Sequence, residues 1–409
     1  MRRPDLHSAA FWARPGLKAV LDILNADGEE ARVVGGAVRN ALMGVAVGDV
    51  DIATTALPQD VMLRAKAAGL KAVPTGLDHG TVTVVADHTP YEVTTLREDT
   101  QTDGRHAVVT FGRDWARDAA RRDFTINALY ATRDGAVIDL INGLADIAAR
   151  KVRFIGDADT RIREDYLRIL RLFRSHAGYG AGEMDAAALR ACERQRAGLL
   201  PLSRERVGAE MRKLLLARGA VPTLQVMSDS GLLQPLLAGI GDVPLLGRLV
   251  TLEQEWGVQA DAMRHLAALA LRIPDDVPRL RARLRLSNEE TRRLSAMAGM
   301  LPRLTDAASG RVQLYHLGAE AVRDIALLEA ARHTTSPARK AALHAVVQQA
   351  GDWQRPRLPI TARNLIAHGL KPGPELGEAL RRAEAIWIDA DFPDAEEQMA
   401  AIVENAIVK

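Results

Sequence analysis

The sequence predicts an α+β protein, with a mixed domain up to about residue 156 and an all-helical remainder. The chain has 409 residues, more than one compact core usually holds, so two or more domains are expected. Hydrophobic residues make up 47% but aromatic residues only 4%, which favours packed helices over an all-β protein. Runs of β-branched residues occur early in the chain and largely stop after Asp157.

In the first part of the chain, strand-like and helix-like patterns alternate, which is typical of a mixed α/β domain. A buried strand is expected at 32–34, ending in Gly35-Gly36, and the helix that follows is stopped by Gly44. The expected helices span 16–26, 37–43 and 58–68, and the expected strands span 32–34, 49–54, 81–85 and 91–96.

Beyond Asp157, apolar residues recur at three- and four-residue spacing, as they do on the buried face of a helix. Helices are expected over 160–176, 205–217, 263–271 and 289–300. Pro356 and Pro359 predict a hinge over 353–359, and Pro372-Gly373-Pro374 a turn into a last helix at 375–386.

Composition excludes several classes of protein. The formal net charge is only +2, so overall charge does not predict a nucleic-acid partner. Cys192 is the single cysteine, which excludes an intrachain disulfide and a cysteine-based zinc site. No run of eighteen apolar residues and no signal-peptide core are present, so a soluble, cytoplasmic protein without membrane contact is expected.

The most informative residues are Asp49 and Asp51. Residues two apart in an extended segment point to the same side, so these carboxylates should converge. A divalent cation between them would keep both ionised, and two such ions can polarise an α-phosphate and steady a leaving pyrophosphate. Oxygen ligands suit Mg²⁺, or Mn²⁺, rather than zinc. The same spacing also occurs at Asp157/Asp159 and Asp389/Asp391, so the spacing alone is not specific.

The upstream Gly35-Gly36 turn makes the pair more specific. Backbone N–H groups at the start of a helix bind phosphate, and glycine allows close approach. Arg39, one turn into that helix, is placed to contact the same triphosphate. This is not a P-loop, because no Gly-Lys-Ser/Thr follows.

The Gly-Gly-x-x-Arg…Asp-x-Asp arrangement resembles the first motif of the class II nucleotidyltransferases, which include CCA-adding enzymes and bacterial poly(A) polymerases. Asn40 stands where that family usually carries Asp, and a modest effect is expected because Asn keeps a hydrogen-bonding oxygen. Glu92 matches the position of the family's third carboxylate, although an exposed strand glutamate explains it equally well. The resemblance implies a mixed-sheet nucleotidyltransferase head followed by a helical neck, body and tail.

A second motif, Arg121 to Ala128, is similar to the family's nucleotide-binding motif. The resemblance implies that Arg122 contacts the nucleotide and that Asp123 and Asn127 lie near the ribose. A carboxylate that accepts from the 2′-hydroxyl would favour NTP over dNTP. A simple exposed helix end is the alternative.

A third motif begins at Glu164 and matches the family's Glu-Asp-x-x-Arg pattern. Asp165 and Arg168 are expected about one helical turn apart, where they can act together. Asp accepts from an exocyclic amine and Arg donates to the adjacent ring acceptor, so the pair admits CTP and ATP and rejects UTP and GTP. Arg171 and Arg174 are expected to face triphosphate or RNA backbone. Ordinary ion pairs on a helix are the alternative.

Further segments match the family. Residues 139–146 resemble the hinge motif between head and neck, with Asn142 where a glycine is usual, and 203–210 resemble the motif that supports the neck. The predicted domains are a catalytic head (1–156), a neck that recognises the base (157–220), a body (221–355) and a tail (356–409). Body and tail are expected to bind RNA, with Arg264, Arg272, Arg279, Arg281, Arg283 and Arg285 as basic candidates or as solvated helix faces.

The resemblance implies addition of C, C and A to the 3′ end of tRNA from CTP and ATP, with no protein partner expected. A polar loop over 98–114, too long for a simple hairpin, resembles the flexible loop of complete CCA-adding enzymes. Partial addition (CC or A) and poly(A) synthesis are the alternatives on the same scaffold. A catalytically silent RNA-binding protein is the alternative from another class.

Overall fold

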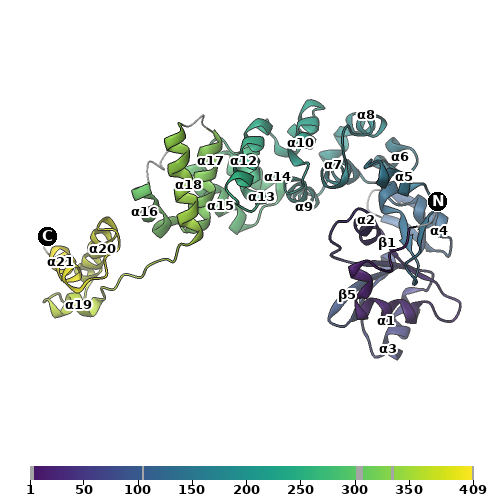
Figure 1. Ribbon diagram of the computed structural model, residues 1–409, viewed down its shortest axis with the longest axis horizontal. Helices are drawn as coiled ribbons and strands as arrows, with labels where there is room; N and C mark the ends of the chain where they lie inside the picture. The colour runs from purple at the N-terminus through teal and green to yellow at the C-terminus, as the bar shows by residue number, and fades with distance from the viewer. Residues whose placement is uncertain (1–3, 104–105, 301–306, 333–335, 408–409) are drawn as a thin grey trace. The chain divides into compact units, whose positions relative to one another are not determined.

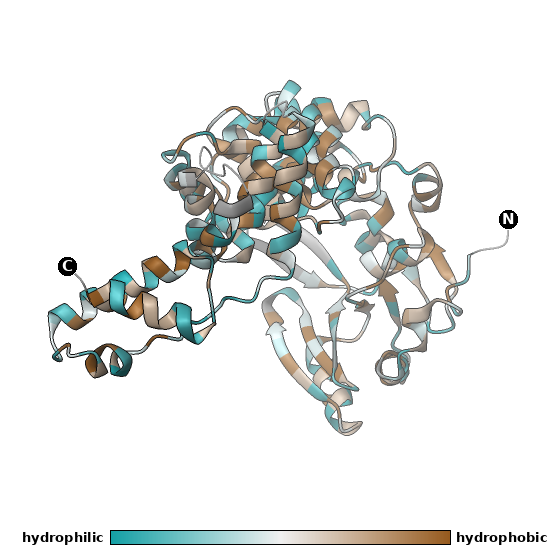
Figure 2. Ribbon diagram, turned by 60° about the vertical axis from the view of Figure 1, so that its left-hand side comes forward, coloured by the Kyte–Doolittle hydropathy of each residue, from teal (hydrophilic) through white to brown (hydrophobic). Residues whose placement is uncertain are grey.

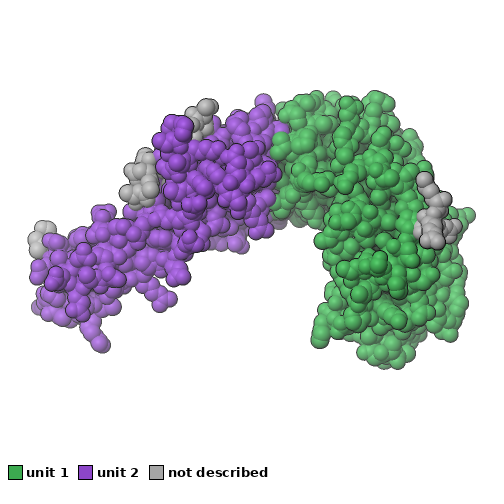
Figure 3. Space-filling model, viewed as in Figure 1, with its two compact units in different colours: residues 1–236 green, residues 237–409 purple. Residues whose placement is uncertain are grey.

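The computed structural model describes residues 4–103, 106–300, 307–332 and 336–407. The chain divides into two compact units, residues 1–236 and residues 237–409 (Figure 3). The first unit holds the sheet and the helices that follow it, and the second unit is helical (Figure 1). The predicted α+β class, a mixed-sheet head followed by a helical remainder, is confirmed.

The head is built on a seven-stranded sheet in the order β3-β4-β5-β2-β1-β8-β9. β2 and β5 run parallel, and the other neighbouring pairs are antiparallel. The strands are β1 (Ala31–Val34), β2 (Asp51–Thr54), β3 (Lys71–Gly76), β4 (Thr81–Ala86), β5 (Thr89–Thr95), β8 (Leu129–Ala131) and β9 (Val137–Asp139). Four strands were expected where the structure has them, whereas β3, β8 and β9 were not predicted.

Two helices cover part of the sheet and close the head's core. α1 (Pro15–Leu24) contacts β4, and α3 (Pro58–Ala67) contacts β3 and β4. Each begins with proline, whose fixed φ suits the first turn of a helix. Leu17, Val20 and Leu24 of α1 are fully buried among strand residues such as Val82 and Val84. The other head helices are α2 (Gly36–Leu42), α4 (Trp115–Ala120) and α5 (Gly143–Ala148).

The polar segment after β5 is a hairpin, so the prediction of a loop over 98–114 was wrong. β6 (Arg97–Asp103) pairs antiparallel with β7 (His106–Phe111), in a register that runs from Arg97↔Phe111 to Asp103↔His106. Threonines and valines in the two arms favour extended backbone, which outweighs their polar neighbours. Residues 104–105, between the two strands in the sequence, lie outside the described residues.

The rest of the first unit is helical, with α6 (Ala158–Glu164), α7 (Leu167–Tyr179), α8 (Ala186–Arg194), α9 (Arg204–Leu215) and α10 (Ala220–Asp229). α7 packs against α9 and α10. The predicted continuous helix over 160–176 was wrong, because Asp165 has extended backbone angles (φ −156°, ψ 105°) between α6 and α7. Its carboxylate accepts a hydrogen bond from the N–H of Leu167 at 3.1 Å, and such local bonds compete with helix formation.

The second unit contains helices only, among the residues that the structure describes. They are α12 (Val243–Glu255), α13 (Ala262–Ala270), α14 (Asp276–Leu284), α15 (Asn288–Met300), α16 (Ala307–Leu317), α17 (Ala319–Arg332), α18 (Pro337–Gly351), α19 (Ala362–Ala367), α20 (Pro374–Asp389) and α21 (Glu396–Ile407), while α11 (Leu233–Leu237) lies at the boundary. Residues 353–360 have no regular structure, and α21 was not predicted. Hydrophilic and hydrophobic residues alternate around these helices (Figure 2). No described helix combines the length and the apolar character needed to span a membrane.

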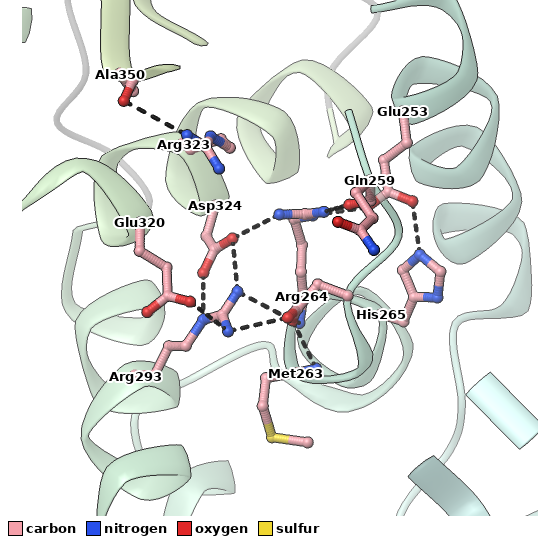
Figure 4. A network of polar contacts seen from close by, with 11 residues as sticks. Glu253, Gln259, Met263, Arg264, His265, Arg293, Glu320, Arg323, Asp324 and Ala350 are labelled. Carbon is pink, nitrogen blue, oxygen red and sulfur yellow. Dashed lines mark hydrogen bonds and ion pairs between the residues drawn. The ribbon is translucent and has the colours of Figure 1, made fainter. Parts of the chain in front are cut away.

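A buried network of charges joins α12, α13, α15 and α17 in the second unit (Figure 4). Arg264 is only 2% exposed and donates to Glu253 at 2.6 Å and to Asp324 at 2.8 Å. Arg293 also contacts Asp324, and His265 contacts the second oxygen of Glu253 at 2.7 Å. Arg264 is therefore a core residue, and its prediction as a phosphate-binding candidate was wrong.

We expect Arg264→Ala to destabilise the second unit strongly. The change leaves two buried carboxylates without their shared cation, which typically costs about 3–5 kcal/mol. Urea unfolding followed by circular dichroism measures the loss. Arg281→Ala, at an exposed residue of the neighbouring α14, is the matched control, with an expected change within about 0.5 kcal/mol. Equal effects of the two substitutions would contradict the structural role of the network.

Candidate active site

Parallel pairing of β2 with β5 brings carboxylates together at one place in the sheet. The pairing sets Asp51 directly opposite Glu92. Asp49 lies two residues earlier, just before β2. Desolvation and then Glu92 raise the pKa of Asp51, Arg122 opposes them, and Asp49 adds a smaller upward effect. Three acids separated in sequence thus form one cluster of like charge.

Two neighbouring pockets meet at Asp51. The larger, of about 670 Å³, is lined by Asp49 and Asp51, with Gly35, Gly36 and Gly48. The smaller, of about 500 Å³, is lined by Asp51 and Glu92 together with His79, Thr81 and Thr94. A carboxylate shared by two pockets can serve two substrates that must react with each other.

The carboxylates fit a divalent cation by their chemistry. Desolvation and then the acidic neighbours raise the pKa of Asp51, and a bound cation would favour its ionised form. Within the described residues, no group of three or more His, Cys, Asp or Glu side chains is arranged to hold an ion. Magnesium is commonly bound by one or two carboxylates, with water and substrate phosphates completing its octahedron. The Asp49/Asp51 pair offers that partial set.

The glycine turn lies beside the carboxylates, as expected. Gly35 has φ 72°, a conformation that strains other residues, and it precedes the first residue of α2. Arg39 is 8% exposed and its guanidinium stacks on the ring of Tyr179 at 3.7 Å. It also donates to Asn127 at 2.6 Å and to Asn40 at 2.8 and 3.1 Å. The nitrogens predicted to contact a triphosphate are thus already engaged within the protein.

Arg121 and Arg122 are anchored by Asp118, which sequence reasoning missed. Asp118 is 1% exposed and contacts Arg121 at 2.5 Å, Arg122 at 2.9 Å and the hydroxyl of Tyr130 at 2.7 Å. Burial opposes the charge on Arg122, but the Asp118 carboxylate outweighs it and raises the pKa of the guanidinium. Asp118 precedes Arg122 by four residues, a spacing that could have predicted the pair.

The predicted ribose-binding residues form a connected chain. Asp123 is 7% exposed and accepts from Asn127 at 3.0 Å and from the N–H of Phe124 at 2.8 Å. Arg171 contacts the other oxygen at 2.8 Å. Burial raises the pKa of Asp123, but Arg171 and these hydrogen bonds hold it below its usual value, so the group is a carboxylate at neutral pH. Asn127 in turn accepts from Arg39.

Asp165 and Arg168 do not lie on one helix as expected, and each has a different partner, while their joint action on a base stays a prediction. Asp165 is bound by Arg206 of α9 at 2.6 Å, and Arg168 is bound by Glu164. Asp165 lies at the break between α6 and α7, and from there its side chain contacts α9. Arg168 lines the larger pocket, whereas Asp165 is absent from its lining. Arg174, on the next turns of α7, also lines it and contacts Glu210 of α9 at 2.5 Å.

The lining of the larger pocket contains more basic than acidic side chains. Its basic lining residues are Arg39, Arg97, Arg121, Arg122, Arg168, Arg171, Arg174 and Lys213. Such a set attracts a polyanion such as a triphosphate or an RNA backbone. Lys213 of α9 and Tyr179 of α7 were not predicted, and no motif in the sequence marks them.

Comparisons with known proteins agree with this arrangement. A family model described as the poly A polymerase head domain matches residues 31–153. A model for domain 2 of tRNA nucleotidyltransferases matches 261–403, and one for an RNA- and SrmB-binding site of polymerase A matches 183–242. The mitochondrial CCA tRNA nucleotidyltransferase 1 of Mus musculus is 32% identical over 397 residues, covering 95% of this chain and 90% of the relative. The CCA-adding enzyme of Latilactobacillus sakei is 34% identical, over 93% of this chain and 95% of the relative.

The chain belongs to the CCA-adding tRNA nucleotidyltransferase family. It is therefore a nucleotidyltransferase. Among solved structures, the Bacillus stearothermophilus CCA-adding enzyme in complex with CTP has a TM-score of 0.73 and 28% identity, covering 96% of this chain and 98% of that one. The Thermotoga maritima CCA-adding enzyme complexed with tRNA has a TM-score of 0.69 at 18% identity, covering 99% and 100%, and shows the shared fold.

Two motifs that resemble this family's hinge and neck-support elements are structurally well formed. Asp139 accepts from the N–H groups of Ile141, Gly143 and Leu144 at 3.1, 2.9 and 2.9 Å. Asn142 adopts φ 65°, a left-handed conformation that Asn tolerates better than most residues, so glycine is not required there. Ser203 caps α9, the helix that carries Arg206 and Glu210.

Asp51→Asn should raise the melting temperature (Tm) of the metal-free protein at neutral pH. A raised pKa means that the folded chain binds the proton more tightly than the unfolded chain, so ionisation of Asp51 destabilises the fold. The gain should vanish below about pH 4, near the pKa of an unfolded aspartate, where both states are protonated. Calorimetry against pH measures it. Asp60→Asn, exposed on α3, is the control, and an equal gain there would contradict the specific effect of the cluster.

Proposed function

We propose that this member of the CCA-adding family adds C, C and A to the 3′ end of tRNA, using CTP and ATP and releasing pyrophosphate. The observation that best supports this function is that Asp49 and Asp51 line a pocket together with several arginines, while Glu92 lies opposite Asp51 in the sheet. The nucleotide would occupy the larger pocket. The acceptor end of the RNA would occupy the smaller one, on the Glu92 side of Asp51.

Asp49 and Asp51 would hold the divalent ions, with Mg²⁺ as the expected metal and Mn²⁺ as a substitute. When bound, the ions would supply Lewis acidity at the α-phosphate and charge neutralisation on pyrophosphate. Glu92 is placed to complete the acidic cluster from β5. Gly35 and Gly36 let the chain approach the phosphates closely, and Arg122 is held ready by Asp118. Arg39, Asp123 and Asn127, already linked by hydrogen bonds, would fix the wall beside the ribose.

Asp165 and Arg168 would read the base without a template strand. An aspartate accepts from the exocyclic amine that cytosine and adenine share, and an arginine donates to the adjacent ring acceptor. For this reading, Asp165 must turn from Arg206, and Arg168 from Glu164, towards the nucleotide. Arg171 and Arg174, which line the pocket from α7, would contact triphosphate or RNA backbone.

The comparisons do not favour poly(A) synthesis or partial addition, because the relatives described above are named as CCA-adding. The retained carboxylates speak against a silent RNA-binding protein. We further propose a head (1–156), a neck that recognises the base (157–220), and a body (221–355) and tail (356–409) that bind tRNA. A cytoplasmic location stays a prediction, since the relative from Mus musculus is named mitochondrial.

Incubation with labelled CTP and ATP, Mg²⁺ and tRNA trimmed of its CCA end tests the activity. Two C residues and then one A are expected, whereas a long A tail or no incorporation would contradict the proposal. Asp49→Ala should abolish incorporation because it removes half of the carboxylate pair. Binding of tRNA, measured by filter retention, should change little in that variant.

Asp165→Ala should loosen the choice among the four nucleotides. Each base contact is worth roughly 1–3 kcal/mol, so the preference for CTP over UTP should fall by about ten-fold or more. The ratio of kcat/KM values for the two nucleotides measures the preference. Asp159→Ala, in the same region but bound to Arg194 and Gln195, is the control. An unchanged preference in Asp165→Ala would refute the base-reading role.

A further inference from the structure

The backbone that carries Asp49 has no regular secondary structure. Residues 45–50 connect α2 to β2 and belong to neither a helix nor a strand. The side chain of Asp49 lines the nucleotide pocket nonetheless. A carboxylate that is to bind a metal ion at a fixed place needs its backbone held. Something other than helix or sheet bonding must supply that restraint here.

Two side chains hold three consecutive carbonyl groups of this connection. Asn40 donates through Nδ2 to the carbonyl of Ala46 at 3.0 Å. Arg14 donates through one terminal nitrogen to the carbonyl of Val47 at 2.8 Å, and through the other to that of Gly48 at 2.9 Å. The residue after Gly48 is Asp49 itself. The three hydrogen bonds therefore restrain the backbone immediately before Asp49.

The backbone of Arg14 is itself held in place by its neighbours. It immediately precedes Pro15, the first residue of α1, and its N–H donates to the carbonyl of Phe11 at 3.3 Å. Phe11 and Leu17, on either side of it, are buried in the core of the head. A guanidinium is a planar fork that can serve two acceptors at once. Arg14 also lies outside residues 31–153, which match the head-domain family model.

The orientation of the Asn40 amide is fixed by its neighbours. Its oxygen faces two guanidinium nitrogens of Arg39, which can only donate, at 2.8 and 3.1 Å. Its nitrogen faces the Ala46 carbonyl, which can only accept. An aspartate, which the resemblance gives as usual at this position, would accept from Arg39 equally well but could not donate to Ala46. The expectation for Asn40 concerned only its side-chain oxygen, whereas in the structure its side-chain nitrogen also makes a hydrogen bond.

We propose that Arg14 and Asn40 are positioning residues that hold the carbonyls of Ala46, Val47 and Gly48 so that Asp49 stays at the metal-binding place. This inference rests on the proposed metal role of Asp49. Neither residue has to touch the nucleotide for this role. Loss of either should therefore reduce metal binding and turnover more than nucleotide affinity.

Arg14→Gln tests the inference, with Lys18→Gln on the exposed side of α1 as the charge-matched control. Mn²⁺ binding is measured by electron paramagnetic resonance with CTP present and RNA absent, so that no turnover occurs. Replacing a residue that orients a metal ligand without touching the metal typically lowers metal affinity or activity by about 10- to 100-fold. We expect losses of that size in Mn²⁺ affinity and kcat for Arg14→Gln, with the KM for CTP within about two-fold and Tm near that of the control.

Arg14→Lys should recover only part of the loss, because an ammonium is a single point donor and cannot span two carbonyls as a fork does. Full recovery would show that charge alone matters and would overturn the clamp. Equal Mn²⁺ affinity and kcat in Arg14→Gln and Lys18→Gln would also overturn it.

Asn40→Asp provides a second test if Arg14→Gln lowers Tm. It keeps the contact with Arg39 and removes the bond to Ala46, but it also adds a negative charge to the pocket that Asp49 lines, which by itself would strengthen cation binding. Mn²⁺ affinity and kcat should nevertheless fall while Tm holds, because the loss of the bond outweighs the added charge. Because both residues restrain one segment, the double variant should lose less than the product of the single losses. Full multiplicativity, or wild-type metal affinity in Asn40→Asp, would contradict the inference.

Asp49→Ala separates failure of this inference from failure of the proposed function. If Asp49→Ala retains Mn²⁺ affinity and incorporation, the metal role itself is wrong, and the clamp fails with it. If Asp49→Ala loses both while Arg14→Gln and Asn40→Asp resemble Lys18→Gln, the metal role stands and only the clamp is refuted.

Discussion

The parallel pairing of β2 with β5 is the constraint on which the site depends. It sets Asp51 opposite Glu92, although forty residues of chain separate them, and it makes like charges neighbours. Desolvation and the nearby like charges both raise the pKa of Asp51, so its ionised form is disfavoured in the metal-free fold. Such a cluster lowers the stability of the metal-free fold. A bound cation removes the repulsion between the carboxylates, and this relief contributes to the free energy of cation binding. The acidic cluster thus explains both the expected metal and the surrounding positive charge.

Several of the arginines around the pocket are restrained by a neighbouring acid. Asp118 holds Arg122, Asp123 holds Arg171, and Glu210 holds Arg174. An unrestrained guanidinium is a bidentate partner for any carboxylate within reach and would compete with a metal ion for the cluster. Anchoring acids keep the positive charges at the wall of the pocket, where a triphosphate can use them. The acids that hold the arginines are therefore as much a part of the site as the arginines themselves.

Local patterns predicted the elements that form the base of the site, and long-range pairing explains the rest. The glycine turn and the Asp-x-Asp spacing marked β1, α2 and β2, because backbone conformation and strand alternation act over a few residues. The strands β8 and β9 have only three residues each, too few to show a period. Arg14 could not be found from motifs, because the Val47 and Gly48 carbonyls meet it only through the tertiary fold, and the same holds for the contact of Asp118 with Tyr130.

The break between α6 and α7, where a continuous helix was expected, affects how the site can select a nucleotide. On one continuous helix, Asp165 and Arg168 would share a face and neutralise each other. The extended backbone at Asp165 instead gives the two residues different partners, Arg206 and Glu164. The side chains of the Asp165–Arg206 pair remain 22% and 33% exposed, and ion pairs that water can reach typically contribute about 0.2–1 kcal/mol. A base contact worth roughly 1–3 kcal/mol can displace such a pair, so the nucleotide-free arrangement holds Asp165 in place without preventing it from reading a base.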